Sequence, residues 1–242
     1  MTQPLSPSQS VGTAIGLTFG SVLLGGVVVS ISITLLVILG FDVASSPSLR
    51  LLLSTVLLQG VTFGGLAIIY LKARGLGLDY APFTVPTMRD IAAIAVGIVA
   101  LLGLLFATST IISLLGLKSA QNQIVTIGQQ NPEAFLVLIP LSFLVVGPGE
   151  ELLFRGLVQG TLRESLHPTR AIVLASVLFA SIHLFSLSGE GKLVYIGIAF
   201  VLALVLGAAY EYTGNITVPA MIHGAYNAVQ FTIAYLTATG GL

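Results

Sequence analysis

The chain has 242 residues, of which 55% are hydrophobic and only 7% are charged, against about 25% charged residues in an ordinary soluble domain. Nine basic residues balance nine acidic ones, so no net charge directs the protein to nucleic acid or to an acidic partner. The chain has no cysteine, which excludes disulfides, thiolate metal sites and cysteine nucleophiles and leaves serine, carboxylate and imidazole chemistry.

The first apolar stretch is predicted to be a membrane-spanning helix rather than a cleavable signal. Residues 1–10 contain no Lys or Arg, and the charge-free run over 11–40 is much longer than the roughly 7–15 residues of a signal core. Residues 51–71 and 91–117 are long enough to cross as well, because a hydrocarbon core of about 30 Å takes about 20 residues. Residues 1–133 are therefore predicted to hold three spanning helices and their loops.

Glycines recur at four-residue spacing in the first two of these runs. They are Gly12, Gly16 and Gly20, followed by Gly60 and Gly64. Small residues at this spacing let neighbouring helices approach closely in lipid. We expect these glycines to lie at contacts between helices.

The C-terminal part, residues 134–242, is predicted to continue the same integral membrane domain. Its first run, from 134 to about 163, contains Pro148 and Gly149 and is interpreted as one long kinked helix, although a full break would add a crossing. Apolar runs follow at 169–185, 193–212 and 216–236. The predicted fold is an all-α polytopic membrane helix bundle of about eight transmembrane helices, with seven possible, around an intramembrane polar cavity.

Basic residues in the loops predict the orientation of this bundle. They cluster in two connections, with Lys72, Arg74 and Arg89 in one and Arg163 and Arg170 in the other. The positive-inside rule places such loops in the cytoplasm. We therefore expect a multi-pass protein of the cell membrane, surrounded by membrane lipid, with these connections on the cytoplasmic side.

Five ionisable side chains lie within or beside apolar runs of the C-terminal part. Each costs about 2.5–3.5 kcal/mol at mid-bilayer on insertion scales, and such residues mark functional sites by default. The first three helices carry no ionisable residue in their interiors. A polar site is therefore predicted among the last helices, built from Glu150, Glu151, Arg155, His183 and His223.

Helical geometry separates the two glutamates. Glu151 and Arg155 are four residues apart, on one face and in the favourable order for an ion pair. Glu150 is rotated by about 100° from Glu151 and has no basic residue at its own i+3 or i+4 position, so it is free to react. Glu150 and His183 lie at equal distances from the turn near His167, so antiparallel packing predicts that they share a water molecule.

The last helix adds two polar side chains on one face. His223 and Asn227 are four residues apart and point the same way. Asn and neutral His both supply N–H donors, which can stabilise charge on a carbonyl oxygen. A carboxylate, an imidazole and these donors together predict a hydrolytic site.

Each of these residues also has a purely structural interpretation. Glu150 and Glu151 can favour the positive end of a restarted helix, and His183 can be a hydrogen-bonded core residue. His223 and Asn227 can hold neighbouring helices together. Their joint occurrence on three helices favours the site.

In order and approximate spacing, three motifs of the chain resemble the CAAX protease and bacteriocin-processing (CPBP, Abi) family of membrane endopeptidases, which includes the Ras-converting CAAX prenyl endopeptidases. The resemblance covers roughly residues 134–236 and includes the neighbouring Phe154-Arg155-Gly156. The motifs are Glu150-Glu151-x-x-x-Arg155, Phe179-x-x-x-His183 and His223-x-x-x-Asn227.

The resemblance implies a glutamic-type endopeptidase of about eight transmembrane helices with a cavity open to the cytosolic side. Carried over, Glu150 and His183 activate water and His223 and Asn227 hold the oxyanion, with no cofactor and no metal. Glu151 and Arg155 form a structural ion pair at the site. The implied substrate is a peptide or a lipidated, prenylated protein cut near its C-terminus.

Three alternatives remain open from the sequence. Glu150, His183 and His223 could ligate zinc, although the H-E-x-x-H arrangement is absent. The chain could be a non-catalytic membrane scaffold or immunity protein of the same fold, because a fold does not guarantee an activity. A transporter is the third, but its two halves show no convincing repeat.

Overall fold

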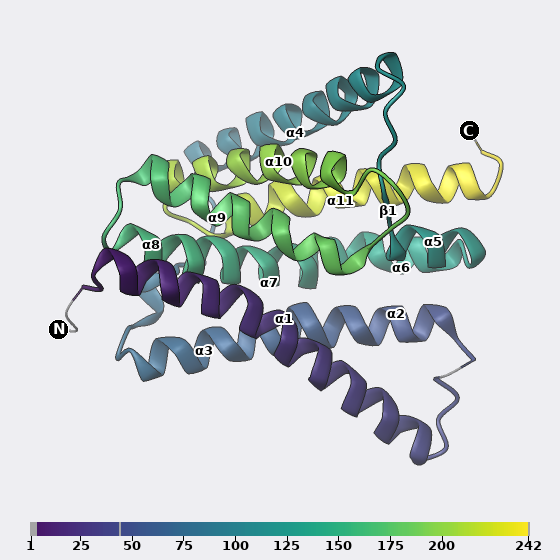
Figure 1. The fold of residues 1–242 in the computed structure, drawn as a ribbon, viewed down its shortest axis with the longest axis horizontal. Helices are drawn as coiled ribbons and strands as arrows, with labels where there is room; N and C mark the ends of the chain where they lie inside the picture. Colours follow the sequence, from purple (N-terminus) through teal and green to yellow (C-terminus); the bar gives the residue numbers. More distant parts are fainter. Residues whose placement is uncertain (1–3, 44, 242) are drawn as a thin grey trace.

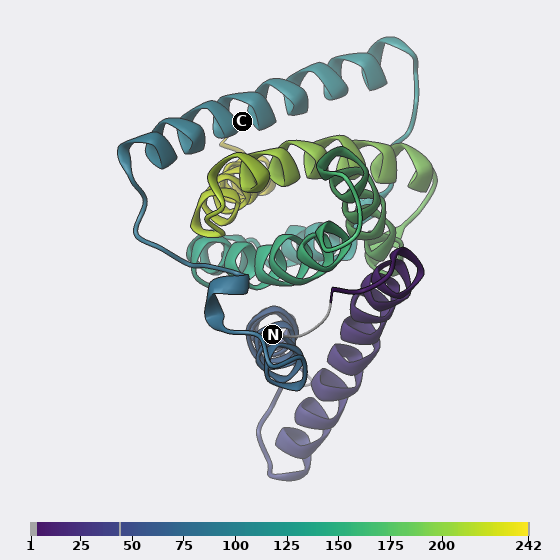
Figure 2. The same cartoon turned by 90° about the vertical axis from the view of Figure 1, so that its left-hand side faces the viewer.

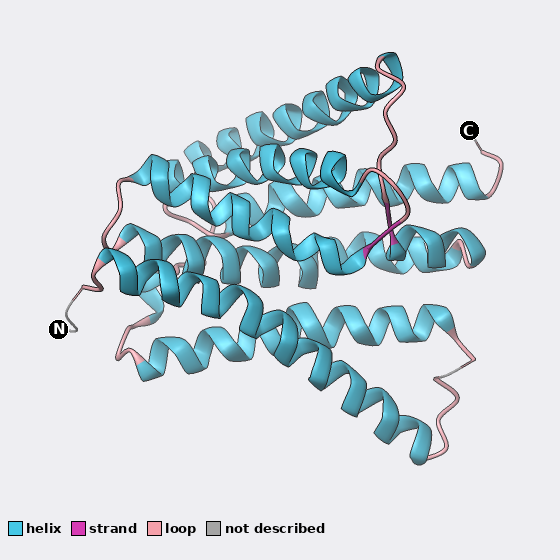
Figure 3. Ribbon diagram, viewed as in Figure 1, coloured by secondary structure: helices cyan, strands magenta, loops and turns pink. Residues whose placement is uncertain are grey.

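A computed structural model describes residues 4–43 and 45–241, so residues 1–3 of the predicted N-terminal segment lie outside it. The described residues form an all-α membrane helix bundle, as predicted (Figure 1). The described part contains one short antiparallel pair of strands, β1 (Gln121–Asn122) and β2 (Leu187–Ser188) (Figure 3). Its apolar surface and long helices make the protein an integral, multi-pass membrane protein.

Three long helical segments come from the N-terminal part of the chain. Capping boxes begin two of them, from Ser6 to Gln9 and from Thr87 to Asp90, which satisfy the first N–H groups of each helix. Figure 2 shows α4 on one side of the central helices, with α1 and the α2–α3 segment on the other. The elements are α1 (Pro7–Ile38), α2 (Pro47–Thr55), the π-helical η1 (Val56–Phe63), α3 (Gly64–Ala73), the short η2 (Leu78–Tyr80) and α4 (Met88–Leu114).

The C-terminal part supplies the central helices. After the short α5 (Gln123–Gln130), one helical segment runs without interruption from Glu133 to Arg163. It consists of α6 (Glu133–Leu141), η3 (Ser142–Val146), α7 (Gly147–Glu151), η4 (Leu152–Gln159) and α8 (Gly160–Arg163). It is followed by α9 (Pro168–Ile182), η5 (His183–Ser186), α10 (Lys192–Thr213) and α11 (Thr217–Ala238).

Pro148 does not break the long segment. Proline lacks an N–H and its ring clashes with the preceding turn of an α-helix, but here the wider π-helical turn η3 precedes it. The single long helix is therefore confirmed, and the break that would have added a crossing does not occur. Six described segments are long and apolar enough to cross a membrane, and the 22-residue α11 packs against α4 and α6 beside them.

The glycines expected at helix contacts mostly do not lie there. A Cβ built on Gly12, Gly16, Gly20 or Gly64 would meet no atom within 4 Å. For the three glycines of α1, the reason is the rotation of this helix, which buries another face, formed by Ala14, Leu17, Thr18, Ser21 and Gly25. Gly60 makes one contact, with the side chain of Val145.

One end of the bundle carries the basic loops, which are tied to acidic partners. Arg74 Nη2 lies 2.9 Å from Glu164 Oε2, and Tyr80 Oη donates to Glu164 Oε1 at 2.8 Å. Arg163 pairs with Glu211 at 2.9 Å. Burial alone would raise the pKa of Glu164, but hydrogen bonds from Arg74, Tyr80 and the Leu5 amide outweigh it and hold that pKa below its ordinary value.

Candidate active site

Glu150, Glu151 and Arg155 lie in the middle of the long segment, at the junction of α7 and η4. The side chains of Glu151 and Arg155 are fully buried, and that of Glu150 is 10% exposed. Arg155 Nε lies 2.8 Å from Glu151 Oε2, although neither atom makes an aligned hydrogen bond. The expected ion pair is thus present as a close contact of opposite charges. The Arg155 guanidinium also stands 5.1 Å from the centre of the Phe179 ring.

His223 reaches this pair from α11. Its Nδ1 lies 2.8 Å from Glu151 Oε1. A carboxylate paired with an arginine accepts hydrogen bonds only, so Nδ1 carries a proton and donates it to Glu151. The Nε2 atom of the same ring lies 3.9 Å from Glu150 Oε2.

This contact determines which protonation state would let His223 act as an oxyanion donor. A neutral imidazole has one N–H, and here Glu151 takes it. Nε2 can donate to an oxyanion only when His223 is the doubly protonated cation. In that state the two carboxylates, Glu150 and Glu151, would balance the two cations, Arg155 and His223, so that each buried charge has a partner of opposite sign.

His183 begins η5, at the end of α9. Its Nδ1 lies 2.9 Å from the carbonyl oxygen of Phe179, and a carbonyl only accepts, so Nδ1 carries the proton. Neutral His183 therefore presents an unprotonated Nε2 that can accept a proton from water. Its ring lies 4.9 Å from the Phe179 ring and 6.1 Å from the Tyr195 ring, measured between centres.

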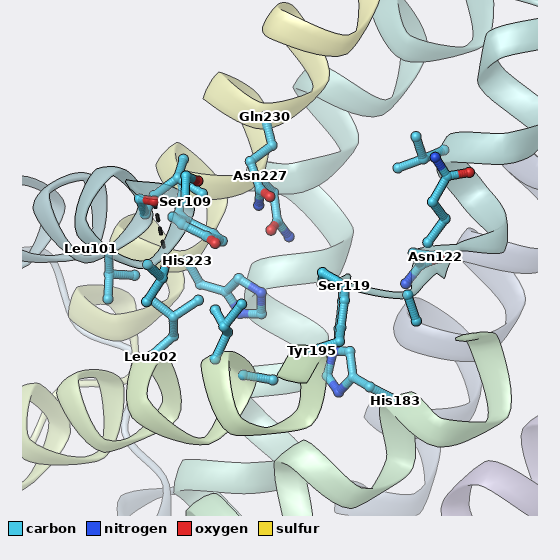
Figure 4. Close-up of a pocket in the computed structure, with 18 of the residues that line it drawn as sticks. Leu101, Ser109, Ser119, Asn122, His183, Tyr195, Leu202, His223, Asn227 and Gln230 are labelled. Carbon is cyan, nitrogen blue, oxygen red and sulfur yellow. Dashed lines mark hydrogen bonds between the residues drawn. The ribbon is translucent and has the colours of Figure 1, made fainter. Parts of the chain in front are cut away.

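A cavity of about 470 Å³ lies in front of the histidines (Figure 4). His183 of η5 and His223 and Asn227 of α11 line it. Among the described residues, the Asn227 amide makes no hydrogen bond, which leaves its N–H groups available to a ligand. The rest of the wall is largely apolar and comes from α4 and α10, including Leu101 and Leu202.

Glu150 stands beside the cavity and is not part of its wall. Its Oε1 accepts a hydrogen bond of 3.2 Å from Gln59 Nε2, and its Oε2 faces His223. Within the described residues no hydrogen bond joins Glu150 to His183. A water molecule shared by Glu150 and His183 stays a prediction.

Sequence reasoning missed several polar residues of the site, among them Gln59, Tyr195 and Asn122. Gln59 is the single amide in the apolar run over 51–71, and that isolation was the signal that could have found it. Tyr195 and Asn122 line the cavity from the start of α10 and from β1. They could not be found from spacing, because they lie at the ends of elements where no helical period relates them to the motifs.

The acidic and imidazole groups do not converge as a metal site. Among the residues described, no three side chains of His, Asp or Glu are placed to hold one ion. The zinc alternative therefore has no ready set of ligands in this geometry.

Comparison with known proteins matches the C-terminal part of the chain to a known family. Residues 132–229 match a family model described as type II CAAX prenyl endopeptidase, Rce1-like. This stretch runs from the start of α6 through most of α11, and it includes all three motifs. Comparisons with curated proteins and with solved structures give no match.

Proposed function

We propose, from the premise that this chain belongs to the Rce1-like family of type II CAAX prenyl endopeptidases, that it cuts a peptide bond within the membrane with water activated by Glu150. The family is one of membrane proteases. The observation that carries the proposal is that His183, His223 and Asn227 line one cavity, from η5 and α11. Glu150 of α7 stands beside that cavity, 3.9 Å from His223, and all four residues lie inside the matching stretch.

In the proposed mechanism, Glu150 Oε2 accepts a proton from the attacking water. His183 Nε2 orients that water from the cavity wall, because its Nδ1 proton is held by Phe179. The Nε2–H of cationic His223 and the Asn227 amide donate to the developing oxyanion. The proton then passes to the leaving amine, and no covalent intermediate forms.

We propose a lipidated peptide as substrate, cut near its C-terminus. The cavity wall on α4 and α10 is mainly apolar, which suits a prenyl chain, whereas His223 and Asn227 stand on α11 and His183 at the end of α9. An apolar wall with few placed polar groups is typical of sites that bind such ligands.

Two expectations about orientation came from the sequence, namely that the basic loops lie in the cytoplasm and that the cavity opens to the cytosolic side. In this structure the two expectations require opposite orientations in the membrane. The cavity is lined by residues 119–122 and by the start of α10, at the end of the bundle opposite the loops with Arg74, Arg89 and Arg163. We propose that those basic loops lie in the cytoplasm, because this rests on the charges of this chain. The expectation of a cytosolic opening rests on the family resemblance alone.

The experiment compares wild-type protein with Glu150→Gln, purified in detergent and incubated with C-terminal peptides. The amide keeps the size of the side chain and removes the base, so we expect cleavage to fall about 10²–10⁴-fold with an unchanged melting temperature. Activity at the wild-type level in the variant would contradict the assignment. Wild-type activity that disappears with a chelator and returns with zinc would favour the metal alternative instead.

A further inference from the structure

Gln59 connects the N-terminal half of the chain to the site. It lies in η1, a π-helical stretch, and its Nε2 donates to Glu150 Oε1 at 3.2 Å. π-Helical turns inside longer helices recur at functional sites. None of the three motifs contains this residue, which lies outside the matching stretch 132–229.

The chemistry of the contact fixes the orientation of the amide. A carboxylate oxygen accepts hydrogen bonds, so the Nε2 end of Gln59 must face Glu150. The other end, Gln59 Oε1, is buried and has no hydrogen-bond partner among the described residues. Leaving a buried oxygen unpaired is unfavourable, and a leucine would avoid this cost. A role in packing alone does not account for a glutamine here.

The backbone at Gln59 also packs closely against the helix that carries Glu150. A Cβ on Gly149 would overlap the carbonyl oxygen of Gln59, so the glycine before Glu150 lets η1 approach α7 closely. The close packing of the two backbones places the Gln59 amide within hydrogen-bond reach of Glu150. The amide is therefore held at the carboxylate by both helices.

We propose that Gln59 is a positioning residue for Glu150. Its N–H holds Oε1, so Oε2 stays turned towards His223 and the reacting water. The other charged or titratable groups near Glu150 are Glu151 and Arg155 on its own segment, His223 on α11, His183 at the end of α9 and Tyr195 on α10. This inference rests on the proposed function, since it assigns Glu150 the role of base.

The test uses full-length protein with Gln59→Met, which keeps the length of the side chain and removes the donor. With a farnesylated C-terminal peptide, we expect kcat to fall about 10–100-fold, with KM changed less than twofold. Gln59→His, which restores an N–H, should recover part of kcat. The matched control is Gln159→Met, which removes a buried amide that donates to the Gly207 carbonyl, and it should keep the wild-type kcat.

A second measurement needs no substrate. A hydrophobic carbodiimide reacts with the neutral form of a carboxyl group, and a donor to the charged form protects it. Mass spectrometry should therefore show faster labelling of Glu150 in Gln59→Met than in wild type or Gln159→Met. Unchanged labelling, or a wild-type kcat in Gln59→Met, overturns the proposal. If wild-type protein cuts no peptide, the proposed function fails while the labelling still decides whether Gln59 acts on Glu150.

Discussion

His223 decides the charge of the site at the scale of single residues. It stands between two carboxylates, 2.8 Å from Glu151 and 3.9 Å from Glu150. The helical spacing predicted the neighbourhood of Glu151 and Arg155, because both lie on one helix. The contact between His223 and Glu151 joins residues 72 positions apart. Helical periodicity relates only residues of one helix, so it could not predict that Nδ1 of His223 contacts Glu151.

Glu164 makes the stability of the basic end depend on pH. Its pKa lies below the ordinary value because the hydrogen bonds from Arg74, Tyr80 and Leu5 outweigh burial. Because the pKa of Glu164 is lower in the folded protein, the ionised carboxylate stabilises the fold at any pH above its pKa in the unfolded chain, near 4.5. This stabilisation is lost as the pH falls from 4.5 through the lower pKa of the folded protein. We expect the melting temperature in detergent to decrease below about pH 4.5, and to decrease less in Glu164→Gln. Equal pH profiles for the two proteins would contradict this.

The long helical segment of α6 to α8 positions the site at the scale of elements. The sequence predicted that this segment is one long helix with Pro148 inside it. Its length could be predicted because an apolar run is a local signal. The π-helical turns η3 and η4 on either side of Glu150 and Glu151 were not predicted. η3 packs against η1 and α11, and η4 packs against α1 and α9. The composition of one segment does not contain these contacts.

The close approach of η1 and α7 can be tested with a single methyl group. Gly149→Ala places a Cβ against the Gln59 carbonyl, so the helices must separate, at a cost of about 1–3 kcal/mol. We expect a lower melting temperature and reduced peptide cleavage. The matched control is Gly64→Ala, where the added carbon has no neighbour within 4 Å, and it should match wild type. Equal behaviour of the two variants would show that the contact is not tight.

At the scale of the whole molecule, the basic loops and the cavity lie at opposite ends of the helix bundle. Arg74, Arg89 and Arg163 lie at one end of the bundle, and Lys118 and Glu190 pair at the other, near the cavity. The all-α membrane bundle was predictable, because a low charge content and long apolar runs dictate it. The end of the bundle at which the cavity lies could not be predicted, because it depends on how the helices pack in three dimensions.

The absence of cysteine makes the orientation directly measurable. Val85, in the loop before α4, is 89% exposed, and the Glu190 side chain at the opposite end is 78% exposed. A membrane-impermeant maleimide added to intact cells should label Glu190→Cys and should label Val85→Cys only after lysis. The reverse pattern would place the cavity on the cytoplasmic side.

Peptide cleavage in ¹⁸O-labelled water tests the central claim most directly. Purified wild-type protein and Glu150→Gln are incubated with farnesylated and unmodified C-terminal peptides, and the products are weighed by mass spectrometry. We predict that wild type cuts the farnesylated peptide at one bond and places one ¹⁸O in the new carboxyl group, whereas Glu150→Gln leaves the peptide intact. No cleavage by wild type, or equal cleavage by both proteins, would contradict the account.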